Sequence, residues 1–246
     1  MSIPSEEVSR NILYRDILSF LRYVTKRTPY PQLTETGNLN LRSLREVNDT
    51  LIRKQPMEDR IGDKVFPVRS EHQLWYLRTI DALLEAAGLT MRTKRRLLPL
   101  LPRVLQFDGL DPQAQFLHLW RSFARQMEWP DLAYWTNDAR IAGTLQLHQD
   151  MVWRYLHERE TEVRHGPFSY VKTLDWARET FKIRWVTAHG DNADLARSGI
   201  SRVLFHYMLV PWGFARYDTA DDTCALTSLG REVIALEASG GMNPAT

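Results

Sequence analysis

The sequence predicts a mainly α-helical protein with two small two-stranded hairpins, each placed between helices. Most apolar residues recur at the three- and four-residue spacing of a buried helix face. In each half of the chain, one segment runs from a helix end through a glycine into a short strand, a polar tip and a returning strand. We call these hairpins the first wing and the second wing. A helical layer is expected to join the two units that carry them.

The elements of the first half follow from this spacing and from the turn residues. Apolar residues from Ile12 to Val24 lie on one helix face, and Gly88 sits where a later helix would end. A charged segment over 55–68 contains Gly62 and Pro67, so an exposed, mobile loop is expected there. The expected elements are a helix over 12–24, a helix over about 40–51 after the Gly37-Asn38 turn, a helix over 71–87, and a first wing with strands at 89–91 and 97–101.

The second half reads in the same way. Asp111 and Pro112 are typical of an N-cap and a first helical position. Pro211 and Gly213 end a helix before the second wing, and Thr227 occupies the N-cap position of the last helix. The expected elements are helices over 112–127, 144–157, 168–181 and 200–209, a polar loop or short turn over 191–199, second-wing strands at 214–217 and 224–226, and a last helix over 229–236.

Composition and charge restrict the class of protein. The chain has 246 residues, 43% hydrophobic and 25% charged, enough for one large domain or two small ones. It contains no apolar run near the roughly 18 to 20 residues of a membrane span, and its polar start lacks a signal-peptide layout, which favours a cytoplasmic location. Residues 1–106 hold 18 Lys+Arg against 12 Asp+Glu, whereas 107–246 hold 14 against 18, so the first half is the basic half.

The second wing and its flanks resemble the end of a winged-helix domain. The residues that carry this resemblance are the Gly213-Phe214 turn, which opens the wing, and the phrase LTSLGRE from Leu226 to Glu232, which leads into the last helix. The resemblance implies a fold, but winged helices bind DNA, bind proteins or dimerise.

A second resemblance covers about residues 12–135. The phrases LTETGNLN, LLEAAGL and DPQAQFLHLWRSFARQMEWPDL occur there in this order. This order is similar to the helicase-associated modules of bacteria, including the amino-terminal module of XPB-type helicases. The resemblance implies a DNA-associated protein whose partner is a helicase or another nucleic-acid enzyme. The chain departs from a helicase because it has no GxxxxGK[ST] loop and therefore no motor. The expected divisions are an N-terminal winged-helix-like unit over 1–106, a central helical region over 107–188 and a C-terminal winged-helix unit over 189–246.

Cations in the first half are the candidate nucleic-acid contacts. The tip of the first wing concentrates Arg92, Lys94, Arg95 and Arg96, which suits the phosphates of double-stranded DNA and carries no sequence preference. The helix after the Gly37-Asn38 turn adds two more cations in the manner of a recognition helix, Arg42 and Arg45. The alternative is a solvated basic turn that keeps the protein soluble.

The second wing is a poor candidate for DNA, because its tip carries Asp218, Asp221 and Asp222. Its neighbouring aromatic residues, Trp212, Phe214 and Tyr217, suit a protein interface, and the alternative is that they belong to the core.

Patterns of catalysis and metal binding are absent from the sequence. The seven histidines form no metal-ligand spacing, and no GxSxG or GxGxxG phrase occurs, so no catalytic residue, metal or cofactor is expected. The single Cys224 and most of the eight tryptophans are expected to pack as core residues. The predicted function is a non-catalytic, DNA-associated accessory protein. The alternative is a protein-interaction or dimerisation scaffold that makes no contact with nucleic acid.

Overall fold

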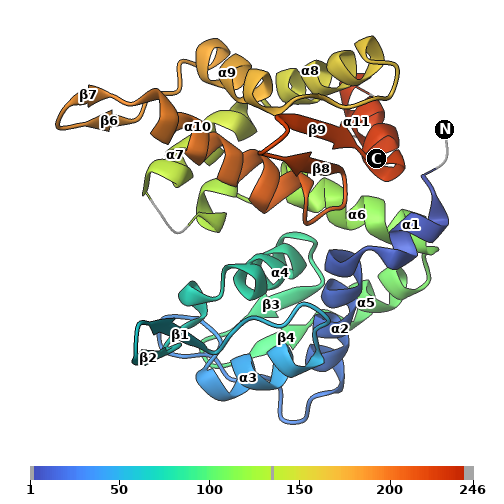
Figure 1. Ribbon diagram of the computed structural model, residues 1–246. Coiled ribbons are helices and arrows are strands. Elements are labelled where there is room, and N and C mark those ends of the chain that lie inside the picture. Colours follow the sequence, from blue (N-terminus) through green and yellow to red (C-terminus); the bar gives the residue numbers. More distant parts are fainter. Residues whose placement is uncertain (1–2, 134–135, 241–246) are drawn as a thin grey trace. The chain divides into compact units, whose positions relative to one another are not determined.

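The structure is a computed structural model that describes residues 3–133 and 136–240 (Figure 1). The chain folds into two compact units. One unit is Val8–Met127, and the other combines Met1–Glu7 with Glu128–Thr246. Helix α1 (Ser5–Arg10) crosses the boundary between them.

The Val8–Met127 unit contains five longer helices and two hairpins among its described residues. Their N-caps agree with the sequence: the side chains of Asn11, Asn40 and Asp111 accept the backbone N–H three residues later. Gly88, at φ 66°, follows the helix that it was expected to end. The elements are α2 (Ile12–Lys26), α3 (Leu41–Thr50), β1 (Glu58–Ile61), β2 (Lys64–Pro67), η1 (Glu71–Gln73), α4 (Trp75–Ala86), β3 (Thr90–Arg92), β4 (Leu97–Pro99), α5 (Leu101–Asp108) and α6 (Pro112–Arg125).

The first wing pairs as predicted. Strand β3 runs antiparallel to β4, with Thr90 opposite Pro99 and Arg92 opposite Leu97. The segment before α3 adds an isolated β-bridge to the wing, between Gln32 and Arg96. The order along the chain is therefore helix, bridge, helix, helix and wing, around a core formed by α2, α3 and α4.

The segment over 55–68 is a hairpin and not the expected loop. Strands β1 and β2 are antiparallel and are joined at Gly62 and Asp63, where Gly62 has φ 60°. The described side chains of β2 are all exposed, and Val65 and Phe66 are 48% and 45% exposed. The side chains of β1 and β2 whose burial is described, at 58–60 and 64–67, are all exposed, so these strands lack the apolar alternation by which a half-buried strand is recognised.

The second unit is also mainly helical. Its elements are η2 (Trp129–Leu132), α7 (Thr136–Leu147), α8 (Gln149–Glu162), β5 (Phe168–Ser169), α9 (Tyr170–Thr180), β6 (Val186–Thr187), β7 (Gly190–Asp191), α10 (Ala193–Ser201), a π-helical segment η3 (Arg202–Leu209), β8 (Ala215–Asp218), β9 (Thr223–Leu226) and α11 (Ser228–Ala238). Helices α10 and η3 are continuous, because Ser201 and Arg202 both have helical backbone angles. The polar stretch over 191–199 is therefore largely the first part of this helix and not a loop.

The second wing belongs to a three-stranded sheet in the order β5-β9-β8. Phe168 of β5 lies opposite Cys224 of β9, and Ala215 of β8 lies opposite Leu226. The helix expected over 144–157 is two helices, because the backbone at His148 leaves helical geometry between α7 and α8. The second unit repeats the element order of the first: α8, β5, α9, α10 and the wing follow one another along the chain. Each unit also has one further hairpin, β1-β2 before α4 in the first and β6-β7 before α10 in the second.

The mainly helical class with small wings is confirmed. The three-part division differs from the two units. Helix α6, expected in a central region, packs on α4 in the first unit, whereas α8 and α11 pack together in the second. Helical periodicity marks which face of a helix is buried, but not which helix covers it. The sequence alone therefore does not indicate that α6 packs on α4.

Core packing accounts for four tryptophans, which are the largest fully buried side chains: Trp120, Trp129, Trp153 and Trp212. Trp135 lies outside the described residues.

Within the described ranges, no helix combines the length and apolar character needed to cross a membrane.

Candidate nucleic-acid interface

Arg92 is half-buried, with a side chain that is 26% exposed, and its guanidinium group is bound by neighbouring residues of its own unit. Its Nη2 donates to Oδ2 of Asp81 at 2.5 Å, its Nε donates to the carbonyl of Gly37 at 3.0 Å, and its Nη1 donates to Glu85. The Asp81 side chain is fully buried. The assignment of Arg92 to phosphate contact is wrong, because α4 supplies carboxylates that bind its guanidinium group inside the fold.

The remaining tip cations divide into two kinds. Arg96 is half-buried, and its Nη1 donates to the carbonyl of Tyr30 at 2.7 Å, which fixes the wing to the segment after α2. Lys94 and Arg95 are exposed. The first wing thus offers two free-standing cations at its tip and a third, Arg96, at its side.

Two carboxyl groups lie behind Arg92. Glu71 and Asp81 are both buried, and Oε2 of Glu71 accepts the backbone N–H of Leu39 at 2.7 Å. Burial raises the pKa of Asp81 well above its usual range, with Glu71 acting in the same direction and Arg92 in the opposite one. The other oxygen of each carboxyl group has no donor among the described residues. The contacts of Asp81 and Glu85 with Arg92, and of Glu71 with Leu39, make this cluster a structural support for the wing.

Cations from α2 and its C-cap, from α3 and from the first wing line three hollows on the same unit, and neighbouring hollows share lining residues. The first, of about 370 Å³, is lined by Arg22, Lys26 and Arg27. The second, of about 360 Å³, shares Arg22 and Lys26. The third, of about 160 Å³, shares Arg27 and adds Arg42 and Arg96. We call these five residues, Arg22, Lys26, Arg27, Arg42 and Arg96, the basic face.

Glu46 is the carboxylate that organises part of this face. Arg27 donates to it from Nε at 2.9 Å and Nη2 at 3.0 Å, and Arg42 donates from Nε at 2.9 Å. The hydrogen bond from Arg42 is the largest of the causes that lower the pKa of Glu46, followed by that from Tyr23. Glu46 therefore stays ionised at neutral pH, and it neutralises one of the two arginines that it holds in place.

The basic face unites two predicted residues, Arg42 and Arg96, with three residues that were not predicted. Arg42 has a side chain that is 79% exposed, and Arg45 is also exposed on α3 outside the hollows. Arg22, Lys26 and Arg27 were missed because α2 was analysed for its buried side. The i, i+4 spacing of Arg22 and Lys26 on the opposite side was the available signal.

Helix α3 was expected to meet DNA in the manner of a recognition helix. It packs on α2, and it exposes both Arg42 and Arg45. Contact through the charged groups of exposed cations favours backbone binding over reading of base edges.

The aromatic residues around the second wing are mainly core residues. Trp212 and Phe214 are fully buried, so their assignment to a protein interface is wrong. Tyr217 is partly exposed and stacks on Tyr170 with ring centroids 5.0 Å apart. The apolar residues before the wing point inward because η3 and α11 enclose them, which the alternation of a four-residue strand does not indicate.

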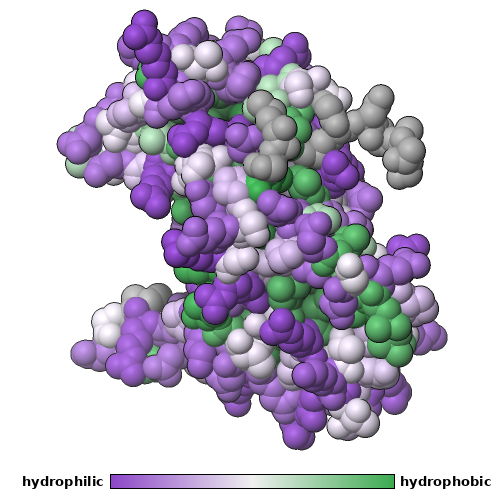
Figure 2. Space-filling model, turned by 90° about the vertical axis from the view of Figure 1, so that its right-hand side faces the viewer, coloured by the Kyte–Doolittle hydropathy of each residue, from purple (hydrophilic) through white to green (hydrophobic). Residues whose placement is uncertain are grey.

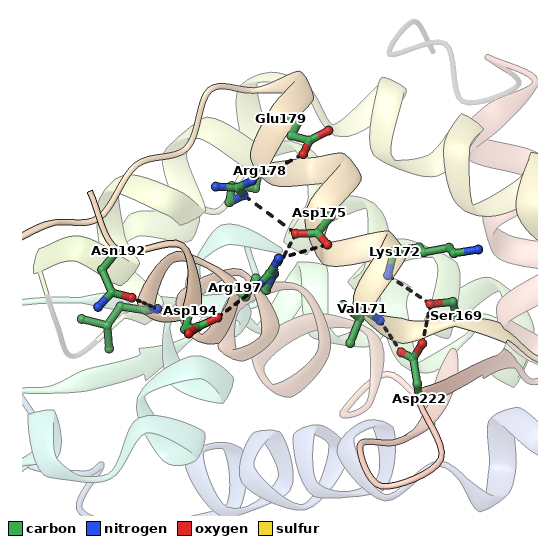
Figure 3. Close-up of polar contacts among 11 residues, drawn as sticks. Ser169, Val171, Lys172, Asp175, Arg178, Glu179, Asn192, Asp194, Arg197 and Asp222 are labelled. Atoms are coloured by element: carbon green, nitrogen blue, oxygen red, sulfur yellow. Dashed lines mark hydrogen bonds and ion pairs between the residues drawn. The ribbon is translucent and has the colours of Figure 1, made fainter. Parts of the chain in front are cut away.

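The acidic tip of the second wing caps a helix. Asp222 accepts the backbone N–H of Val171 at 2.6 Å and the Ser169 hydroxyl at 2.7 Å (Figure 3). These bonds lower its pKa, with the Val171 N–H as the largest cause. Asp218 accepts the N–H of Ala220 within the tip. Two of the three acidic residues thus have local structural roles at the start of α9 and in the turn.

Ion pairs connect α9 to α10 beside this cap. Arg197 on α10 donates to Oδ1 of Asp175 on α9 at 2.7 Å and to Asp194 at 2.8 Å (Figure 3). Arg178 on α9 approaches the same oxygen of Asp175 at 3.8 Å. These charges compensate one another on the surface of the second unit, so they do not form a basic face comparable to that of the first.

The described residues contain no cluster of three or more His, Cys, Asp or Glu side chains suited to a metal ion. Cys224 is buried in β9, and burial raises the pKa of its thiol to about 12. A thiol in such surroundings is unreactive at neutral pH.

Comparisons of the chain with protein-family models, with curated proteins and with solved structures found no match. The winged-helix and helicase-associated resemblances therefore rest on the phrases quoted above, and the functional argument rests on the geometry of the two units.

Proposed function

We propose that this protein is a non-catalytic, DNA-associated accessory protein that holds the phosphate backbone on the basic face of its first unit. The observation that carries this proposal is that five cations from α2 and its C-cap, α3 and the first wing line three hollows that share lining residues. A continuous row of cations matches the repeating charge of a nucleic-acid backbone better than it matches an isolated small ligand.

Several features support low sequence specificity. The cations act through their charged groups, which contact phosphates and sugars without distinguishing bases. Lys94 and Arg95 at the wing tip, and Arg45 on α3, extend the same charge around the face. In this proposal double-stranded DNA is the ligand, a helicase or other nucleic-acid enzyme is the protein partner, and the protein acts in the cytoplasm.

The proposal is tested by fluorescence anisotropy on a labelled DNA duplex. The test variant combines Arg22→Glu, Lys26→Glu and Arg42→Glu, three exposed side chains of the basic face. The matched control combines Arg154→Glu, Lys172→Glu and Lys182→Glu, three exposed side chains of the second unit. Both variants change the net charge of the protein equally. If only net charge mattered, both would therefore lose the same amount of DNA affinity.

Loss of three phosphate contacts is expected to weaken binding by at least about 30-fold in the test variant, at a few tenths to one kcal/mol or more for each contact. The control variant should bind within about threefold of the unaltered protein, a difference of about 0.7 kcal/mol. Equal weakening in both, or no binding of duplex DNA by the unaltered protein, would overturn the assignment of the basic face.

A protein-interaction scaffold is the second candidate, and a specific surface favours it. Leu101 and Leu105 on α5 are 47% and 71% exposed, and Ile12 and Leu110 are also exposed. Hydrophobic surface is visible among the hydrophilic residues of this unit on the side that Figure 2 presents. Leu101 and Leu105 are four residues apart on α5 and share one side of it, and exposed apolar surface of this kind marks interaction sites.

This candidate includes homodimerisation and makes its own prediction. Light scattering after size exclusion at high salt should report a stable dimer or a stoichiometric complex, because apolar contacts persist when charges are screened. A Leu101→Ser and Leu105→Ser variant should then be monomeric. A monomer under all salt conditions, together with salt-sensitive DNA binding, would favour the nucleic-acid function.

A further inference from the structure

The smallest hollow of the basic face has the composition of a phosphate pocket. It measures about 160 Å³ and is lined by Arg27, Arg42 and Arg96 from three different elements. Its other walls are prolines, Tyr30 and short polar residues, and no carboxylate is among its lining residues. Three guanidinium groups around a space of this size suit a single compact anion.

Donors remain available in the pocket after the internal contacts are made. Among the described residues, Arg42 donates a hydrogen bond to Glu46 from its Nε alone. Arg96 donates to the carbonyl of Tyr30 from its Nη1 alone. Both terminal nitrogens of Arg42 and the Nε and Nη2 of Arg96 are thus left for a ligand. The same internal contacts hold the arginines in place, which reduces the entropy lost when they bind.

The start of α3 adds to the favourable potential. Asn40 and Ser43 line the pocket, and the Asn40 side chain accepts the backbone N–H of Ser43 at 2.8 Å. The N–H groups of the first two helical residues, Leu41 and Arg42, belong to the positive end of the helix dipole. An anion in this pocket would therefore meet both charged side chains and a helix N-terminus.

The charge of the pocket indicates the type of phosphate. Arg27, Arg42 and Arg96 carry three positive charges, and Glu46, which touches two of them, carries one negative charge, leaving a net charge of +2. A phosphate monoester carries about −1.5 to −2 at neutral pH. A backbone phosphodiester carries only −1, so the charges balance better with a terminal phosphate than with an internal one.

The surroundings indicate what bears this phosphate. Arg27 also lines the neighbouring hollow with Arg22 and Lys26, so the cations continue from the pocket along α2. A polyanion with a phosphorylated end uses both parts, whereas a singly phosphorylated peptide has no charge to place along α2.

We propose that this pocket binds the terminal phosphate monoester of a nucleic acid while the cations along α2 hold the adjoining backbone. The inference rests on the proposed DNA-binding function and adds an end-specific contact to it. Arg42 is the main ligand, because it is the most exposed of the three and keeps both terminal nitrogens free.

The test compares two short DNA duplexes of the same sequence that differ only in a 5′-phosphate or a 5′-hydroxyl at their ends. Anisotropy titrations are run with the unaltered protein, with Arg42→Gln and with Arg45→Gln. Arg45 is an exposed arginine on the same helix that does not line the pocket, so its variant is the matched control. A phosphoserine peptide and inorganic phosphate are used as competitors.

The expected result is about tenfold tighter binding of the phosphorylated duplex, equivalent to about 1.4 kcal/mol. This preference should disappear in Arg42→Gln and persist in Arg45→Gln. Equal affinity for the two duplexes would overturn the end-specific pocket and leave the DNA-binding function intact. No binding of either duplex would overturn both, and Arg42-dependent binding of the phosphoserine peptide without duplex binding would assign the pocket to phosphoprotein instead.

Discussion

Replacing Arg92 tests whether this residue supports the fold through Asp81 or stands as a free cation at an exposed tip. We expect Arg92→Met to destabilise the first unit, because the change leaves Asp81 buried without the cation that faces it. Breaking a buried ion pair on one side costs about 3 to 5 kcal/mol. Protonation of Asp81 limits this cost, so we expect about 2 to 4 kcal/mol at neutral pH.

The pH dependence follows from the raised pKa of Asp81. Between the ordinary pKa of an aspartate and this raised value, the folded state binds more protons than the unfolded state, so stability falls as pH rises. Removing Arg92 removes an interaction that lowers the pKa of Asp81, and the decline then extends to higher pH. The difference between Arg92→Met and the unaltered protein should therefore be larger at pH 8 than at pH 5, by up to about 1.4 kcal/mol for each unit of added shift.

Urea unfolding followed by circular dichroism at the two pH values measures this difference. Lys94→Met, at the exposed tip of the same wing, is the matched control and should change stability by less than about 0.5 kcal/mol. A change of that small size for Arg92→Met at both pH values would refute the buried ion pair as a support of the wing.

Three further predictions concern the second unit. Asp222→Ala should lower the free energy of unfolding by about 1 kcal/mol, as expected for loss of a helix cap, and Asp222→Asn should lower it less. In thermal unfolding, the difference in stability between the unaltered protein and Asp222→Ala should shrink as pH falls through the lowered pKa of Asp222. Cys224 should resist thiol reagents at pH 8 in the folded protein and react after denaturation; rapid labelling of the folded protein would contradict its burial. Gly230→Ala would place a Cβ 2.0 Å from the carbonyl oxygen of Phe214, so a loss of about 1 to 3 kcal/mol is expected in the same unfolding assay, and an unchanged transition would contradict the close packing of α11 on the wing.

Local patterns were sufficient for the main elements of the fold. The N-caps at Asp111 and Thr227, and the helix end at Gly88, involve residues a few positions apart, so the sequence displays them directly. Both wings were located for the same reason, because each is announced by a glycine and a polar tip. The hairpin over 58–67 was missed because its exposed strands show no apolar alternation.

The candidate site was predicted less well, because charge in a sequence does not reveal the partner of each residue. Arg92 looks like its neighbour Lys94 in the sequence, yet Asp81 lies eleven positions away on α4 and binds it. Trp212 looked suited to an interface although its environment is the core. Arg22 and Lys26 on α2, and Arg27 just after it, were not predicted because they join Arg42 and Arg96 only through tertiary packing.

The salt dependence of DNA affinity measures how many phosphates the basic face contacts. The number of phosphates neutralised by the protein sets the slope of log affinity against log salt concentration, at about 0.9 for each phosphate. With Glu46 offsetting part of the basic face, we expect three to five contacts and a slope of about −3 to −4.5 for the unaltered protein. The Arg22→Glu, Lys26→Glu and Arg42→Glu variant should show a slope shallower by about 2 to 3. A slope near zero, or the same slope for both proteins, would contradict the account.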